Sequence, residues 1–419
     1  MELEATGGKQ ARATRAILAV DRLSALPDCL IHHIMSFMKA RQVVQTCVLS
    51  TRWTHLWRSV PCLDIDLEEF KTTSTNNNCS KEDWMKFEDF TDHLLIPNKI
   101  SIALLDTFRL NVRDTNLYCK QQTTRWIRHG IKYSSQQPSI QRDLLGSCSW
   151  RLKRLHLSHI YLEDCFAQHV SSGCPYLEDL VLQGCRCELQ EITSHSLKSL
   201  VLENCNCWRL SAITSPTLKS LVINGGNNSR DLLVITAHAV AYLLLDVTVY
   251  RFPGGISLNK MPSLAKASIQ LQTNDMEDKL RVDKFKFLDG VSNASSFVMS
   301  GLQTMILCEG FPTFPHFNNL KTLLLDECDL SDNFQILGHF LRNSPNLEKL
   351  TLCRCMAPIK LTTKLKECLN LVGVQCKNLK LTEIIYEDED DHDDVHTLVQ
   401  VFQSISGNLP NNNIKTRQS

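Results

Sequence analysis

The chain has 419 residues, of which 43% are hydrophobic and 21% are charged, so most of it should fold around buried cores in more than one domain. Its 45 basic and 45 acidic residues cancel, and without a basic surplus we expect no nucleic-acid partner. The longest apolar run, residues 232–245, is too short to span a bilayer, so we expect no membrane partner either.

We expect residues 1–20 to be disordered. Residues 1–16 lack the apolar core of a secretory signal peptide. This favours an intracellular protein, in the nucleus, the cytoplasm or both, whose 18 cysteines are mostly reduced.

Residues 21–61 carry more apolar side chains than so short a segment can bury within itself. Three runs have helical spacing, around residues 28–38, 43–48 and 53–57. Pro27 suits the first turn of a helix, and Ser50 can cap a helix that begins at Thr51. About 40 residues is near the lower limit for an independent core, so we expect another protein to cover part of this surface. A helical hairpin that packs only on its own protein is the alternative.

The same segment resembles the F-box of plant F-box proteins with leucine-rich repeats. The resemblance rests on the order of its motifs, which are Leu26-Pro27-Asp28, Leu30-Ile31, Ile34, Val43-Val44, Leu49-Ser50-Thr51-Arg52-Trp53 and Leu56-Trp57-Arg58. It implies docking on a Skp-type adaptor inside a cullin–RING ubiquitin ligase. The adaptor contacts that it implies are Leu26, Pro27, Leu30, Ile31, Ile34, Val43, Val44, Leu56 and Trp57. For Trp53, a place in the core stays open.

Residues 62–99 are expected to form a linker, because residues 72–80 have the polar sequence TTSTNNNCS, typical of a disordered loop. Residues 123–133 predict a helix whose apolar contacts are Trp126, Ile127 and Ile131. In the family that the chain resembles, such a helix joins the F-box to the repeats, and we expect it to cap their open end.

From residue 100 to residue 357 the chain repeats an LxxLxL frame. Clear copies are Leu177/Leu180/Leu182, Leu197/Leu200/Leu202, Leu218/Leu221/Ile223, Leu320/Leu323/Leu325 and Leu347/Leu350/Leu352, and Leu105/Phe108/Leu110 is a candidate first copy. A period of about 20–29 residues with this frame is the signature of leucine-rich repeats. We therefore expect an α/β fold, in which a three-helix F-box precedes a horseshoe-shaped solenoid with short parallel strands on its concave face. A chance leucine pattern in an ordinary α/β domain is the alternative.

The frame is interrupted after Leu264 and resumes as Leu302/Met305/Leu307. The repeat count over residues 270–300 stays open between a poor copy and an inserted loop. Residues 358–406 weakly resemble the extra C-terminal domain, the FBD, of some plant F-box proteins, with a strand over 379–386 and a helix over 395–402. The tryptophans of that domain are absent, so we expect a partial FBD-like cap, followed by a disordered tail over residues 407–419.

Four cysteines occupy equivalent places after their strands, where leucine-rich repeats turn a small Asn or Cys side chain inward. They are Cys185, Cys205, Cys328 and Cys355. This explains the Cys-x-Cys pairs without a metal, and we expect neither metal nor cofactor. The acidic run over residues 387–394 lacks the spacing and the glycine of a calcium loop. The motifs of common hydrolases, nucleotide-binding proteins and zinc proteases are also missing, so we expect no enzyme.

Residues beside the inward leucines should line the concave face in columns. The column between the last two leucines is largely apolar, and the next column contains three acids. We expect a substrate to contact this face through Val181, Val201, Glu203, Val222, Leu244, Asp246, Leu324 and Asp326. Glu203, Asp246 and Asp326 would then favour a basic partner. Mid-strand valines and leucines also fit β-propensity alone, which is the competing interpretation.

Together these features predict a non-catalytic substrate-recognition subunit of a Skp–cullin–F-box ubiquitin ligase. The F-box would bind the Skp-type adaptor, and the repeats would bind a protein substrate whose identity the sequence does not indicate. An interaction scaffold that acts outside a ubiquitin ligase is the alternative function. Co-purification with a cullin distinguishes the two.

Overall fold

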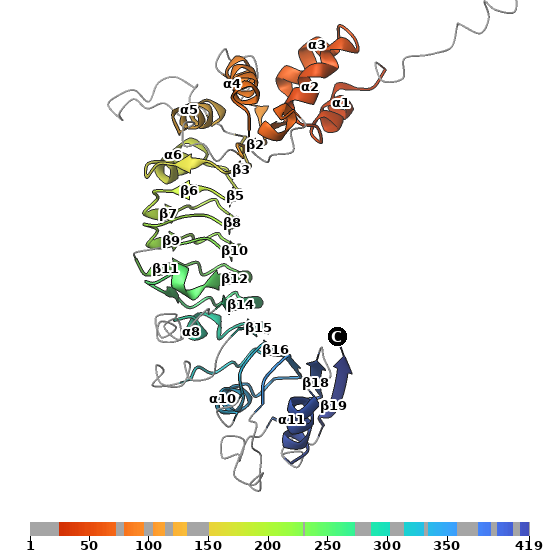
Figure 1. The fold of residues 1–419 in the computed structure, drawn as a ribbon, viewed down its shortest axis with the longest axis vertical. Helices are drawn as coiled ribbons and strands as arrows, with labels where there is room; N and C mark the ends of the chain where they lie inside the picture. Colours follow the sequence, from red (N-terminus) through yellow and green to blue (C-terminus); the bar gives the residue numbers. More distant parts are fainter. Residues whose placement is uncertain are drawn as a thin grey trace, which may run out of the picture.

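The computed structural model describes residues 25–72, 79–95, 104–113, 120–131, 151–228, 231–272, 286–301, 314–330, 334–357, 376–386, 392–404 and 411–418. The chain forms an elongated stack of strands with helices at both ends (Figure 1). The stack bends toward the side that carries the main sheet, as expected for a solenoid with a concave face (Figure 1). None of the helices in the described ranges has the length and apolar character needed to cross a membrane.

The N-terminal helices have the expected order. They are α1 (Asp28–Met35), α2 (Ala40–Gln45), the 3₁₀ turn η1 (Thr46–Val48), α3 (Trp53–Leu56) and the 3₁₀ turn η2 (Trp57–Ser59). Pro27 lies just before α1, and its carbonyl accepts hydrogen bonds from the amides of Leu30 (3.0 Å) and Ile31 (3.2 Å). The predicted cap at Ser50 was wrong. The helix begins at Trp53, and the buried Ser50 hydroxyl has no hydrogen-bond partner among the described residues.

The main sheet has 13 strands over the described residues, and all of them pair in parallel. In spatial order they are β1 (Cys62–Asp66), β2 (Thr107–Asn111), β3 (Arg154–Ser158), β5 (Asp179–Gln183), β8 (Ser199–Glu203), β10 (Ser220–Asn224), β12 (Tyr242–Thr248), β14 (Lys266–Gln272), β15 (Ser296–Ser300), β16 (Thr322–Asp326), β17 (Lys349–Cys353), β18 (Leu381–Tyr386) and β19 (Asn413–Gln418). This arrangement, with one strand for each repeat, confirms the leucine-rich-repeat architecture.

The outer side of the stack carries smaller elements. Its strands are β4 (Tyr161–Leu162), β6 (Arg186–Cys187), β7 (Glu191–Thr193), β9 (Ala212–Thr214), β11 (Leu233–Thr236) and β13 (Ile256–Leu258), and its helices are α6 (Phe166–Gly173), α8 (Leu288–Val291) and α10 (Gln335–Asn343). The turn η6 (Val249–Arg251) precedes β13. Strands β7, β9, β11 and β13 form a second parallel sheet.

The leucines of the repeat frame build one continuous core between these two layers. Leu180, Leu200 and Leu221 are paired in register on neighbouring strands, and each is almost fully buried. Burying one such side chain is worth about 1.5–3 kcal/mol, and a single repeat has no second layer against which to do so. The repeats therefore stabilise one another by stacking.

The segment expected to be a linker, residues 62–99, instead contributes regular structure. It contains β1, the turn η3 (Leu67–Phe70) and the helix α4 (Lys81–Leu95). Leu63 and Ile65 alternate toward the core as the repeat leucines do, but the intervening acids hide that frame in the sequence. Within the predicted polar loop, residues 73–78 lie outside the described residues.

The helix predicted over residues 123–133 is confirmed as α5 (Lys120–Gly130). Trp126, Ile127 and Ile131 are buried, as expected. The Trp126 ring meets the ring of Phe87 on α4 edge-on at 5.4 Å, and its indole nitrogen donates to Asp92 Oδ1 at 2.6 Å. The helix therefore packs on α4, an element that the sequence analysis did not predict.

The repeat frame at Leu302/Met305/Leu307 is not the strand that follows β14. That strand is β15, which pairs with β14 on one side and with β16 on the other. Phe297 and Met299 take the inward positions, so the frame is filled by residues other than leucine. The main sheet therefore has a single strand, β15, between β14 and β16, and it precedes the predicted frame. Residues 273–285 and 302–313 lie outside the described residues, so the choice between a poor copy and an inserted loop stays as the sequence left it.

At the C-terminal end, the predicted strand and helix are present as β18 and α11 (His392–Ser404). The expected disordered tail differs, because residues 413–418 form β19, which pairs in parallel with β18 along its whole length. Most side chains of β19 are exposed, so the sequence has no apolar pattern that would predict this strand. Residues 1–24, expected to include a disordered N-terminus, lie outside the described residues.

Candidate functional site

The N-terminal helices expose apolar side chains that the chain itself does not cover. The exposed fractions are 47% for Leu30, 40% for Ile34, 78% for Phe37, 88% for Val48 and 56% for Leu49. The first three follow one face of α1 and the turn after it, at spacings of four and three residues. We call these five residues the F-box patch. So much exposed apolar area in a short segment is typical of a protein-binding surface.

The predicted adaptor contacts divide into surface and core residues. Pro27, Leu30 and Ile34 are exposed, and Leu26 and Val44 are half-buried. Four others are buried in this chain and present little surface for such a contact: Ile31, Val43, Leu56 and Trp57. Trp53 is also buried, in agreement with the core position left open for it. Phe37, Val48 and Leu49 were missed, because an apolar pattern does not say which face stays uncovered.

Charged contacts join these helices directly to the first strand of the main sheet. Lys39 Nζ lies 3.2 Å from Asp64 Oδ1 and 2.8 Å from Asp66 Oδ2. Burial lowers the pKa of the Lys39 ammonium, but the hydrogen bond to Asp66 and the charges of both aspartates outweigh it and raise the pKa above its usual value. The Arg41 guanidinium lies 4.8 Å from the centre of the Phe70 ring. The junction is therefore packed and ion-paired.

The concave face is organised by the strand register. One side chain from each strand stands in a continuous column: Asp64, Arg109, His156, Val181, Val201, Val222, Leu244, Ser268, Val298, Leu324, Thr351, Glu383 and Lys415. The predicted residues Val181, Val201, Val222 and Leu244 follow one another and are half-buried. They form an apolar floor between charged or polar ends.

Glu203 and Asp246 stand beside this floor, two strands apart. Gln183 Nε2 donates to Glu203 Oε2 at 3.3 Å, and Gln272 Nε2 donates to Asp246 Oδ1 at 3.0 Å. Among the described residues, neither carboxylate forms an ion pair. Burial raises the pKa of the Asp246 carboxyl, and the hydrogen bond from Gln272 opposes this only in part. These two acids therefore present negative charge that no residue in the described ranges neutralises.

Asp326 differs from the other two acids. Arg354 Nη2 lies 2.8 Å from Asp326 Oδ1 and 2.9 Å from Oδ2, and Arg354 Nε adds a bond of 3.1 Å. Such a bidentate pair satisfies the carboxylate within the chain. Leu324 keeps its predicted place in the column. Of the three predicted acids, Glu203 and Asp246 stay open to a basic partner.

The inward positions of the ladder cysteines are confirmed. The thiols of Cys185, Cys205 and Cys355 lie 3.2, 3.1 and 3.4 Å from strand carbonyl oxygens of preceding repeats. Cys328 is equally buried and faces the Met299 carbonyl. The described residues contain no group of three or more His, Cys, Asp or Glu side chains that could hold a metal ion.

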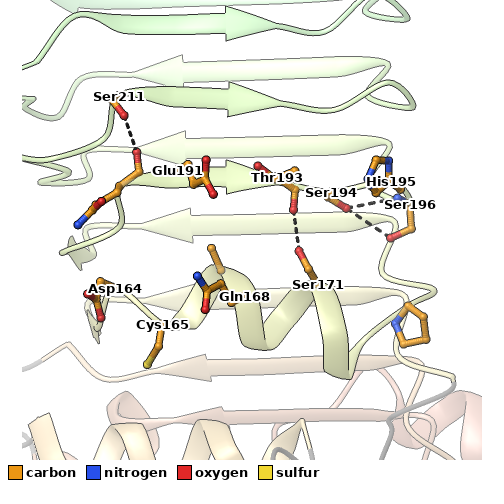
Figure 2. Close-up of a pocket in the computed structure, with 13 residues that line it drawn as sticks. Asp164, Cys165, Gln168, Ser171, Glu191, Thr193, Ser194, His195, Ser196 and Ser211 are labelled. Carbon is orange, nitrogen blue, oxygen red and sulfur yellow. Dashed lines mark hydrogen bonds between the residues drawn. The ribbon is translucent and has the colours of Figure 1, made fainter. Parts of the chain in front are cut away.

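A groove of about 780 Å³ opens on the outer side, between α6 and the edge strand β7 (Figure 2). Hydroxyl, amide and carboxylate groups line it, and Ser171 Oγ donates to the Thr193 carbonyl at 2.6 Å across it (Figure 2). Burial and two adjacent carboxylates raise the pKa of the Cys165 thiol, the opposite of what an activated nucleophile needs. The hydrogen bond between Ser171 and Thr193 ties α6 to the second sheet, and we assign it a structural role.

Two family models match parts of this chain. The F-box domain model matches residues 23–64, and a model described as FBD-associated F-box protein At5g56370, LRR repeats, matches residues 135–247. The chain is similar to the rice MEIOTIC F-BOX protein MOF, with 30% identity over 420 residues that cover 91% of this chain and 83% of the relative. It is also similar to the Arabidopsis F-box/FBD/LRR-repeat protein At5g22660, with 28% identity over 382 residues that cover 79% and 76% of the two chains.

Proposed function

This chain belongs to the plant family of F-box proteins with leucine-rich repeats, and from that premise we propose that it is the substrate-recognition subunit of a Skp–cullin–F-box ubiquitin ligase. Members of this family are generally non-catalytic adaptors. In the proposed role, the F-box binds a Skp-type adaptor and, through it, the cullin–RING core. The repeats bind a protein substrate and hold its lysines near the enzyme that carries the ubiquitin. The rate of ubiquitin transfer then rises because the reactants are held close together.

The F-box patch is the observation that carries this proposal. Its side chains are exposed, while their neighbours Ile31, Val43 and Trp57 already fill the core beneath them. A partner that covers the patch would gain about 25 cal/mol for each Å² of apolar surface removed from water. Phe37 and Val48 have the largest exposed fractions in the patch, so substitutions there change the surface most directly.

The concave column supports the second half of the proposal. Its apolar floor and the unneutralised acids Glu203 and Asp246 suit a substrate segment with lysine or arginine side chains. The aliphatic stems of such residues would lie on Val222 and Leu244, while their charges would meet the carboxylates. An intracellular location, in the nucleus or the cytoplasm, belongs to the same proposal.

Co-expression with a plant Skp-type adaptor, followed by capture of the complex, tests the adaptor role. The test variant carries Phe37→Asp and Val48→Asp, which place charges on the F-box patch without entering the core. We expect it to lose at least about ten-fold in adaptor affinity, because truncating or charging hot-spot side chains typically costs more than 1 kcal/mol.

The matched control is Met85→Asp, on the exposed face of α4, where Met85 is 54% exposed. This control should bind the adaptor as the unaltered chain does. Capture that survives the double substitution would contradict the proposed contact surface. Failure of the unaltered chain to bind any adaptor or cullin would favour the scaffold function instead.

A further inference from the structure

Three consecutive repeats each expose one large apolar side chain in the loop between the main sheet and the second sheet. Trp208 follows β8, Leu232 follows β10 and Tyr250 follows β12, and these strands are neighbours in the main sheet. Their exposed fractions are 44%, 42% and 42%. The row therefore comes from successive repeats, and it lies outside both the F-box patch and the concave column.

Arginines accompany this row. Arg209 and Arg251 directly follow Trp208 and Tyr250 in the chain, and Arg186 lies on β6, one repeat earlier. All three are exposed, and none of them forms an ion pair with another described residue. Arg251 Nε donates to the Tyr250 hydroxyl at 2.9 Å. We call the six residues the loop ridge: Arg186, Trp208, Arg209, Leu232, Tyr250 and Arg251.

The acidic residues of the same loops do not cancel this charge. Glu188 is engaged by a hydrogen bond with Tyr161, on the side of the preceding repeat. Asp231 is the one exposed acid in the described parts of these loops. The loop ridge therefore has a surplus of positive charge, in contrast to the concave face, where Glu203 and Asp246 stand beside the column.

Backbone contacts hold the loops in place. Asn206 forms parallel bridges to Arg186 on one side and to Asn227 on the other. Asn228 then donates from its amide to the Arg251 carbonyl at 2.9 Å and from its side chain to the Leu210 carbonyl at 2.7 Å. The ridge residues thus stand on a fixed backbone with about 4.8 Å between repeats, which lowers the ordering cost of binding.

We propose that the loop ridge docks an acidic segment of a partner protein. Tryptophan, tyrosine and arginine are the residue types that dominate protein-binding hot spots, and here they occur together on exposed positions. The guanidinium groups would take carboxylates, in bidentate geometry where the partner allows it. Apolar side chains of the same segment would cover Trp208, Leu232 and Tyr250. This surface goes beyond the proposed function, because it serves a different segment from the basic one suited to the concave column.

Selection of peptides from a random display library by the full-length chain tests this inference. The ridge variant carries Arg186→Glu, Arg209→Glu and Trp208→Ala. The control variant carries Lys219→Glu and Tyr176→Ala, which alter an exposed lysine and an exposed tyrosine on segments that precede main-sheet strands. We expect the unaltered chain and the control to enrich peptides rich in Asp and Glu with an apolar residue. A selected peptide should bind the ridge variant at least about ten-fold more weakly.

Trp208 supplies an independent readout, because its exposed indole should become protected from iodide quenching when the peptide binds. Failure to enrich acidic peptides, or equal binding of a selected acidic peptide by the ridge variant, would overturn the inference. So would equal binding of anionic vesicles or single-stranded DNA, since that would indicate a general polyanion surface. The F-box patch variant should bind the peptide normally, which separates this test from that of the adaptor.

Discussion

At the scale of single residues, Asp246 is costly to the fold. Its carboxylate is partly buried beside the apolar floor, with one amide hydrogen bond and no described cation to compensate. The folded chain therefore binds the Asp246 proton more tightly than the unfolded chain does, and this residue lowers stability at neutral pH. A residue that costs stability on an exposed face is more simply explained by binding than by folding.

Asp246→Asn should leave the fold intact and remove this cost. The amide oxygen can still accept from Gln272, so we expect the free energy of unfolding at neutral pH to rise by less than about 1 kcal/mol, since the group is largely solvated. The gain should vanish as the pH falls through the ordinary aspartate range, where the unaltered carboxyl takes up its proton. Urea unfolding at both pH values measures this, and a loss of stability at neutral pH would contradict it.

The sequence predicted single residues well where the repeat places them and poorly where exposure decides their role. The ladder cysteines and the column of Val201 and Val222 follow from counting along the frame, because the strand register is regular. The pairing of Asp326 with Arg354 did not follow, since their contact depends on how the chain turns after β17. Phe37 and Val48 show the same limit, because a hydrophobic pattern cannot tell a core face from an open one.

At the scale of elements, strands were predictable only when leucines marked them. β15 uses Phe297 and Met299 at inward positions and was displaced in the prediction by a leucine-containing frame nearby. β1 has two apolar residues between acids, and β19 is almost entirely polar, so neither has a signal of its own. Their place comes from pairing with a neighbouring strand, which supplies backbone hydrogen bonds irrespective of side chains.

The loops between the layers depend on a close approach at Gly226. Its φ is +84°, and a Cβ there would lie 2.3 Å from the Cys205 carbonyl oxygen of the preceding repeat. We expect Gly226→Ala to lower the free energy of unfolding by at least about 2 kcal/mol, because the conformation and the contact both oppose a side chain.

Gly173, at the end of α6, is the matched control. The nearest atom to a Cβ there is the Ile131 carbonyl oxygen, at 3.9 Å. Gly173→Ala should be neutral or stabilise by less than about 1 kcal/mol. Denaturant unfolding of the two variants compares them, and equal effects would contradict the role given to Gly226.

At the scale of the whole molecule, the F-box helices and the repeats form one continuous body. The sheet begins at β1, immediately after η2, and Lys39 joins α2 to the carboxylates of β1. The expectation of a linker in this region was the largest error of the sequence analysis. It arose because the polar sequence of residues 72–80 was taken to represent all of residues 62–99.

Lys39→Glu should loosen this junction. The new carboxylate would face Asp64 and Asp66, and the repulsion would replace two ion pairs. We expect faster proteolysis near residue 62 and a broader distribution of molecular dimensions in small-angle X-ray scattering, whereas Lys39→Arg should behave as the unaltered chain does. Adaptor capture should persist, because Lys39 is not part of the F-box patch. Unchanged scattering and proteolysis would show that packing alone holds the junction.

The unbroken main sheet sets the distance between the proposed adaptor surface and the proposed substrate face. β8 and β12 lie four and six strands from β1 in the sheet order, which corresponds to roughly 20–30 Å at about 4.8 Å for each strand. A substrate held there would present its lysines at a set height above the F-box. Gain or loss of one repeat between β3 and β8 would change that height by the spacing of one strand, about 4.8 Å. Related proteins could in this way change which lysine receives ubiquitin while recognising the same substrate.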